Sequence, residues 1–218
     1  MNKTESRPVP TIADVAAAAG VSTATVSRCL NLPDMVQKET RQRVEDAVKQ
    51  LGYTPNFGAR ALVAKRTNTI GAVIPTMENA IFARGLQAFQ ETLNERGVTL
   101  LVASSQYQPE LEQDQVRTLI ARGVDGFLLI GYQRGSEIYD ELSRRGISAI
   151  IAWAYDPQSP TPAVGFDNRE AMKKLTMEVI GRGHRELAVI SAKTRLNDRA
   201  RERVEGVRDA MRLAGLAD

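Results

Sequence analysis

Cysteine and histidine are nearly absent from this chain of 218 residues, which has one of each, Cys29 and His184. A single cysteine cannot form a disulfide within the chain, and one histidine leaves too few ligands for a zinc site of the Cys/His type. The G-x-S-x-G, G-x-G-x-x-G and P-loop motifs are also lacking. We therefore expect no disulfide, no metal, no cofactor and no enzyme activity.

Long apolar runs are lacking as well. No stretch approaches the roughly 20 residues that a membrane helix needs, and the first ten residues are polar, without the apolar core of an export signal. With 43% hydrophobic and 25% charged residues, the composition is that of an ordinary globular protein. These features predict a cytoplasmic protein with no membrane partner.

The net positive charge is confined to the first third of the chain. Residues 1–66 contain 10 lysines and arginines against 6 acidic residues, whereas residues 67–218 contain 19 against 20. A small basic segment suits the phosphate backbone of a nucleic acid. A solvated basic face gives the same excess, so charge alone leaves both interpretations open.

Short helices are predicted in this basic segment, over residues 12–18, 23–30 and 38–50. Thr11 and Asp14 form a capping box before the first helix, Gly20 makes a turn, and Ser22 can cap the second helix. Two helices joined by so short a turn form a helix-turn-helix, whose second helix lies in the DNA major groove.

The second helix has two different faces. At about 100° per residue, one arc of its surface holds Thr23, Ala24, Ser27 and Arg28. The opposite, packing side holds Val26, Cys29 and Leu30. Arg28 can donate two hydrogen bonds to a guanine edge, which is worth roughly 1–3 kcal/mol of discrimination. The alternative is a surface arginine that contacts phosphate.

From residue 70 onward, apolar runs alternate with amphipathic stretches. The runs at 70–75, 98–104, 126–131, 147–152 and 187–192 predict strands buried on both faces. Helical patterns cover residues 80–96, 110–122, 136–145, 168–182 and 197–214. This alternation predicts an α/β fold with a doubly wound parallel sheet. The proline-rich residues 157–162 are the best candidate for a crossover between two subdomains.

Motifs along nearly the whole chain resemble those of the LacI family of bacterial transcription regulators. The resemblance is carried by T-I-A-D-V-A at residues 11–16, G-V-S at 20–22, T-V-S-R at 25–28, L-G-Y at 51–53, A-R-A-L at 59–62, G-V-D-G at 123–126 and R-E-R at 201–203. The segments at 107–110, 164–168 and 182–185 look most like the gluconate-type repressors. The family implies a homodimer at full length that binds a palindromic double-stranded DNA operator, more often as a repressor than as an activator.

The resemblance also implies a division of the chain. Residues 1–55 would be the helix-turn-helix DNA-binding domain and 56–67 a hinge helix and linker. Residues 68–162 would be an N-terminal effector subdomain of the periplasmic-binding-protein type, and 163–218 the start of a C-terminal one. In the family, the hinge inserts a leucine into the minor groove, and Leu62 matches it; packing against the neighbouring domain is the alternative. The DNA-binding candidates are Thr11, Ser22, Thr23, Ala24, Ser27, Arg28, Asn31, Thr40, Tyr53, Asn56, Ala59 and Leu62.

A small sugar or sugar acid is the expected effector. Doubly wound sheets bind ligands at the carboxyl ends of their strands, where Thr76, Asn79, Phe82 and Trp153 are found. Aromatic rings and hydroxyl or amide groups suit a polyol, although either ring could be an ordinary core residue. By family position Arg203 would reach the effector, where it could bind a carboxylate; a solvated basic face is the alternative for the arginines around it.

One departure from the family concerns the end of the chain. Family members complete a second subdomain and cross back to finish the first, whereas this sequence stops at Asp218. The sequence therefore predicts an incomplete pocket and leaves ligand response and dimerisation open. Two other function classes are the alternatives to a regulator. An enzyme on a doubly wound sheet would have only one histidine for acid–base work. An exported sugar-binding protein would need an export signal, and it leaves the first 66 residues unexplained.

Overall fold

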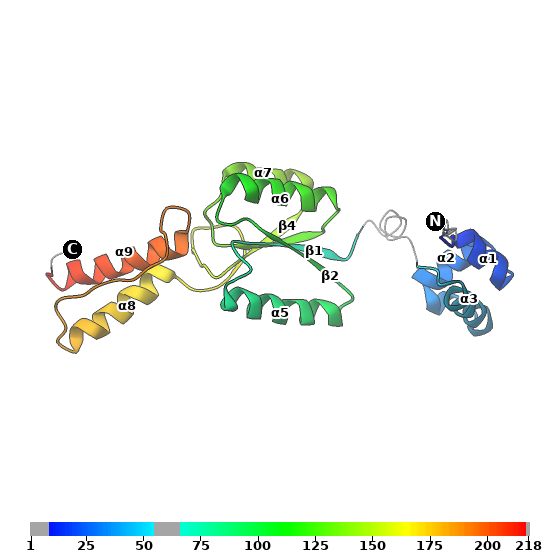
Figure 1. Cartoon of the computed structure of the whole chain (residues 1–218), viewed down its shortest axis with the longest axis horizontal. Helices are drawn as coiled ribbons and strands as arrows, with labels where there is room; N and C mark the ends of the chain where they lie inside the picture. The colour runs from blue at the N-terminus through cyan, green and yellow to red at the C-terminus, as the bar shows by residue number, and fades with distance from the viewer. Residues whose placement is uncertain (1–8, 55–65, 217–218) are drawn as a thin grey trace, which may run out of the picture. The chain divides into compact units, whose positions relative to one another are not determined.

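A computed structural model describes residues 9–54 and 66–216, and it divides the chain into two compact units, Met1–Thr67 and Asn68–Asp218 (Figure 1). In the described residues, no helix is long and apolar enough to cross a membrane, and no group of acidic, cysteine and histidine side chains could hold a metal ion.

The first unit consists of short helices with well-defined ends. These are α1 (Ile12–Ala19), α2 (Thr23–Asn31), the 3-10 helix η1 (Pro33–Met35) and α3 (Lys38–Leu51). The capping box of α1 is present, with the Thr11 N–H donating to Asp14 Oδ2 at 2.7 Å. Gly20 ends α1 at a φ of 64°, and the Val21 N–H returns to the Ala16 carbonyl at 3.0 Å. This pattern is the Schellman motif, which turns the chain sharply toward α2.

One apolar cluster holds these helices together. Val15 of α1, Val26 of α2 and Val44 of α3 are each fully buried, and Cys29 joins them. Because the predicted packing side of α2 supplies Val26 and Cys29, its orientation is fixed by this core.

The second unit is built on a parallel sheet with the strand order β2-β1-β3-β4-β5. The strands are β1 (Thr69–Ile74), β2 (Thr99–Ser104), β3 (Gly126–Ile130), β4 (Ser148–Ala152) and β5 (Ala163–Val164). Helix α5 (Ala80–Glu95) covers one face, and α6 (Pro109–Ala121) and α7 (Ser136–Arg145) cover the other (Figure 1). The predicted α/β fold class is confirmed. The strand order reverses between β1 and β3, and doubly wound sheets bind ligands at the carboxyl ends of strands at such a point.

The last two helices, α8 (Asn168–Gly181) and α9 (Asp198–Leu213), pack against each other. The α9 glycine Gly206 permits this approach, since a Cβ there would lie 3.0 Å from the Lys173 backbone nitrogen and closer still to the Arg169 carbonyl oxygen. The side chain of Arg169 on α8 adds a two-pronged ion pair to Asp209 on α9, at 2.6 and 3.0 Å.

Two sequence-based expectations for this unit were wrong, and one strand was missed. Residues 187–192 form no strand, and Ile190 is fully exposed, because no neighbouring strand among the described residues pairs with this segment. The strands are not all buried on both faces: β2 is an edge strand and is only half-buried. Strand β5 was not predicted, because two residues are too few to give a pattern, and it pairs with β4.

Candidate functional site

The exposed face of α2 is the first candidate site. Thr23, Ala24 and Arg28 are exposed, while Val26 and Cys29 are buried on the opposite side. Ser22 begins the helix by accepting a hydrogen bond from the Thr25 N–H at 3.1 Å. The arrangement presents a guanidinium and two small side chains on a helix whose orientation its core fixes, which is what reading base edges requires.

Two further candidates extend this face toward the end of α2. The Asn31 Nδ2 donates to the carbonyl of Ser27 at 2.9 Å and to its hydroxyl at 3.3 Å. Both side chains are therefore already oriented along the helix axis, and Ser27 is half-buried. Local hydrogen bonds of this kind reduce the rotamer freedom that binding would otherwise have to restrict.

The other described candidates in the first unit contribute to its structure. Thr11 is occupied in the capping box, Thr40 is half-buried in the first turn of α3, and Tyr53 packs against the core cluster. Asn56, Ala59 and Leu62 lie outside the described residues, as does the expected hinge helix.

A cavity of about 370 Å³ lies at the carboxyl ends of β3 and β4. Its wall combines phenols, carboxylates and guanidinium groups. The lining residues are Tyr132, Ala154, Tyr155, Asp156, Pro157, Asp167, Asn168, Arg169, Asp198, Arg199, Arg201 and Glu202.

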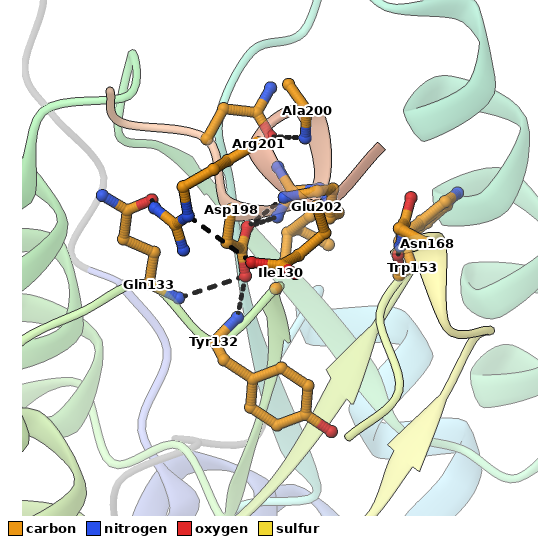
Figure 2. A network of polar contacts seen from close by, with 12 residues as sticks. Ile130, Tyr132, Gln133, Trp153, Asn168, Asp198, Ala200, Arg201 and Glu202 are labelled. Atoms are coloured by element: carbon orange, nitrogen blue, oxygen red, sulfur yellow. Dashed lines mark hydrogen bonds and ion pairs between the residues drawn. The ribbon is translucent and has the colours of Figure 1, made fainter. Parts of the chain in front are cut away.

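Asp198, the first residue of α9, makes the central contact of this wall (Figure 2). Its Oδ2 accepts hydrogen bonds from the backbone N–H groups of Tyr132 at 2.6 Å and Gln133 at 3.3 Å. Its Oδ1 accepts from the backbone N–H and the Nη1 of Arg199, both at 2.9 Å. Both side chains of this pair are at least nine-tenths buried, and burial lowers the pKa of the Arg199 guanidinium.

A second set of contacts joins α8 and α9 to the end of β4. The Asn168 Nδ2 donates to the Trp153 carbonyl at 3.1 Å, and the Asn168 Oδ1 accepts from Arg203 Nη1 at 2.8 Å. Both helices are thus attached to strand ends through polar groups.

The turn after β3 is held in place by Arg134, whose side chain is almost fully buried. Its guanidinium donates to the Gly131 carbonyl at 2.8 Å, to the Tyr139 hydroxyl at 2.6 Å and to Glu112 at 3.0 Å. Burial raises the pKa of Tyr139, and the nearby guanidinium partly offsets that effect. The backbone N–H groups that meet Asp198 are therefore set in a rigid turn.

The sequence-predicted effector residues do not line this cavity. Thr76 accepts from the Glu78 N–H, and Asn79 caps α5 through Ile81. Phe82 is buried and meets the Trp153 ring edge-on at a centroid distance of 5.2 Å, and Arg203 is engaged with Asn168. Their role in binding an effector stays a prediction.

Sequence reasoning missed Asp198, and it did not single out Arg199 among the arginines around Arg203. The available signal was the polar start of a helix, Asn197 and Asp198, directly after a turn. Nothing local indicates that this helix start meets the end of β3, because 66 residues separate Asp198 from Tyr132.

Comparisons with known proteins agree along the chain. Residues 11–56 match a family described as "Bacterial regulatory proteins, lacI family", and residues 67–218 match "Periplasmic binding proteins and sugar binding domain of LacI family". The HTH-type transcriptional regulator GntR of Pseudomonas aeruginosa is 33% identical over 209 residues, covering 96% of this chain and 60% of the relative. The chain thus spans about three-fifths of that relative's length.

Solved structures give the same result. A LacI family transcriptional regulator from Silicibacter pomeroyi is 29% identical with a TM-score of 0.85, over 95% of this chain and 62% of that one. The lac repressor dimer bound to operator and the anti-inducer ONPF has a TM-score of 0.80 over 95% of this chain and 63% of its own. At 24% identity that likeness shows the fold alone.

Proposed function

The chain belongs to the LacI family of bacterial regulatory proteins, and from this premise we propose that it is a sequence-specific DNA-binding transcription regulator, acting as a repressor. Its operator would be a palindromic duplex bound by a homodimer. Binding to chromosomal DNA would require a cytoplasmic location. The proposal includes no enzymatic activity.

The observation that carries this proposal is the exposed face of α2. Arg28 is solvent-accessible on the side opposite the core residues Val26 and Cys29. A buried Arg28 would have been incompatible with base reading. The net positive charge of residues 1–66 supplies the sequence-independent attraction to phosphate that such a helix needs.

We also propose that Leu62 inserts into the minor groove of the operator. An apolar wedge unstacks a base step at a cost of about a few kcal/mol, and the bend that results brings more protein onto the DNA. A segment of this length is marginal as a helix by itself. Its order would therefore depend on DNA and on the state of the effector domain.

The second unit would act as the sensor, with a small sugar or sugar acid as its effector. The cavity at the carboxyl ends of β3 and β4 supports this, because its phenols, carboxylates and guanidinium groups suit hydroxyl-rich ligands. Coupling between the ligand and operator affinity is typically about 1–3 kcal/mol in such systems.

The DNA-binding proposal is tested by mobility shifts with a duplex selected from a random palindromic library and with a scrambled duplex, over a series of salt concentrations. We expect a steep salt dependence and clear sequence selectivity. Arg28→Ala should reduce the preference for the selected duplex by about 10- to 100-fold, which corresponds to roughly 1–3 kcal/mol.

The matched control is Lys49→Ala, which removes one exposed positive charge from the last turn of α3. It should leave selectivity unchanged. Equal losses on the selected and scrambled duplexes for Arg28→Ala would assign Arg28 to phosphate contact instead of base reading. The absence of any selectivity in the unmodified chain would refute the regulator proposal.

A further inference from the structure

Arg199 is the most buried cation in the cavity wall. Its side chain is 8% exposed, whereas Arg169 and Arg201 in the same wall are exposed and are engaged with Asp209 and Gln133, respectively. Arg203, the residue expected from family position, donates to Asn168. The guanidinium best placed to meet a buried anion is therefore that of Arg199.

The surroundings of Arg199 already form an anion cradle. Two consecutive backbone N–H groups, from Tyr132 and Gln133, converge on one carboxylate oxygen of Asp198, and the Arg199 guanidinium donates to the other. Adjacent backbone N–H groups and a guanidinium are the donors that proteins use to bind carboxylates and phosphates. In the structure, a carboxylate of the chain itself occupies this cradle.

The rest of the wall limits what such an anion can be attached to. The cavity is also lined by the carboxylates of Asp156, Asp167 and Glu202, which accept hydrogen bonds from hydroxyl groups and disfavour a second negative charge on the ligand. Tyr132 and Tyr155 add phenols beside them. The exposed arginines of the wall are already engaged with Asp209 and Gln133. The wall therefore suits a hydroxylated chain or ring with a single acidic end.

We propose that Arg199 recognises the acidic end group of a polyhydroxylated ligand, and that this group replaces the Asp198 carboxylate as the partner of the guanidinium. The inference rests on the proposed effector role of this cavity. Because Asp198 also holds the start of α9 against the turn after β3, its displacement releases that contact. Occupancy of the cavity is thereby transmitted to α9.

Calorimetric titration of the whole chain with D-gluconate and D-glucitol tests this assignment. The two probes have the same six-carbon hydroxylated skeleton, and only the first has a carboxylate. We expect D-gluconate to bind at least about tenfold more tightly, because hydrogen bonds between a guanidinium and a carboxylate are stronger than those between neutral groups. Arg199→Gln should abolish this preference.

Asp198→Asn should act in the opposite direction. Removing the internal negative charge leaves the guanidinium without its competing partner, so D-gluconate should bind several-fold more tightly than to the unmodified chain. The controls are Arg212→Gln and Glu205→Gln, which remove one charge of each sign from the same helix and should leave both titrations unchanged. These residues pair with Asp209 and Arg208.

Weaker D-gluconate binding by Asp198→Asn would mean that Asp198 only supports the site. The proposal that the ligand displaces the Asp198 carboxylate would then be wrong. Equal binding of the two probes, or no binding of D-gluconate, would overturn the assignment of Arg199. Binding of neutral sugars in that case would leave the proposed sensor standing, and the mobility shifts test the DNA-binding role separately. If Arg199→Gln fails to fold, Arg199→Lys keeps the charge but loses the planar set of N–H donors, and should reduce the preference.

Discussion

At the scale of single residues, Gly131 shows how the end of β3 accommodates α9. Its φ is 68°, and a Cβ at this position would lie 2.5 Å from Asp198 Oδ1 and closer still to Arg199 Nη1. The residue therefore meets two separate requirements. Its backbone conformation favours glycine, and its lack of a side chain leaves room for the buried pair.

Gly131→Ala should therefore destabilise the second unit by more than the roughly 1–2 kcal/mol of a left-handed alanine alone. Gly97→Ala is the matched control, because Gly97 has a φ of 65° but nothing within 4 Å of the added Cβ. Denaturant unfolding of both variants measures the difference. Equal losses of unfolding free energy would show that the space beside Asp198 adjusts without cost.

Individual residues were predictable from sequence where a local pattern decides their place. The exposed Arg28 and the buried Cys29 follow from their positions on one helix. The contacts of Asp198 could not be predicted in this way, because they depend on how distant segments meet. Phe82 and Trp153 were ambiguous for the same reason, and the structure places their rings against each other.

At the scale of elements, the start of α1 predicts a pH dependence. Hydrogen bonds from the Thr11 backbone and hydroxyl hold the pKa of Asp14 below its ordinary value of 3.8. A carboxyl whose pKa is lower in the folded state stabilises that state above pH 3.8, and the contribution is lost as the pH falls through the lowered pKa.

Asp14→Asn should therefore reduce the loss of first-unit stability on acidification. Denaturant midpoints of α-helical signal, measured at neutral pH and below pH 3.8, provide the comparison. Asp34→Asn in η1 is the control and should retain the acid sensitivity of the unmodified chain. An unchanged acid response in Asp14→Asn would remove the capping box as its source.

Helices were predicted more reliably than strands, for a physical reason. A helix closes its backbone hydrogen bonds within one segment, so caps such as Thr11 and turns such as Gly20 fix its ends locally. A strand needs a partner. Residues 187–192 have the composition of a buried strand and form none, whereas β5 has almost no pattern but pairs with β4.

At the scale of the whole molecule, the division at Thr67 predicts two unfolding events. The core of the first unit is small, and units with separate cores unfold independently unless their interface is large. Scanning calorimetry should resolve two transitions. The selected duplex should raise the midpoint temperature of the first unit's transition, since the duplex binds that unit only in its folded form.

The scrambled duplex serves as the control and should raise that transition less at the same concentration. A single cooperative transition would contradict independent unfolding. The midpoint temperature of the second unit's transition should instead rise when D-gluconate, the probe for the cavity, is added.

The attachment of α8 and α9 to the sheet has a thermodynamic consequence of its own. None of the apolar clusters among the described residues includes a residue beyond 163, and the attachment is made by hydrogen bonds of Asn168 and Asp198. Heat capacity changes in proteins follow the apolar area exposed or buried. Rearrangement at this joint should consequently leave the heat capacity nearly constant, so its enthalpy would be nearly the same in cold and in warm surroundings.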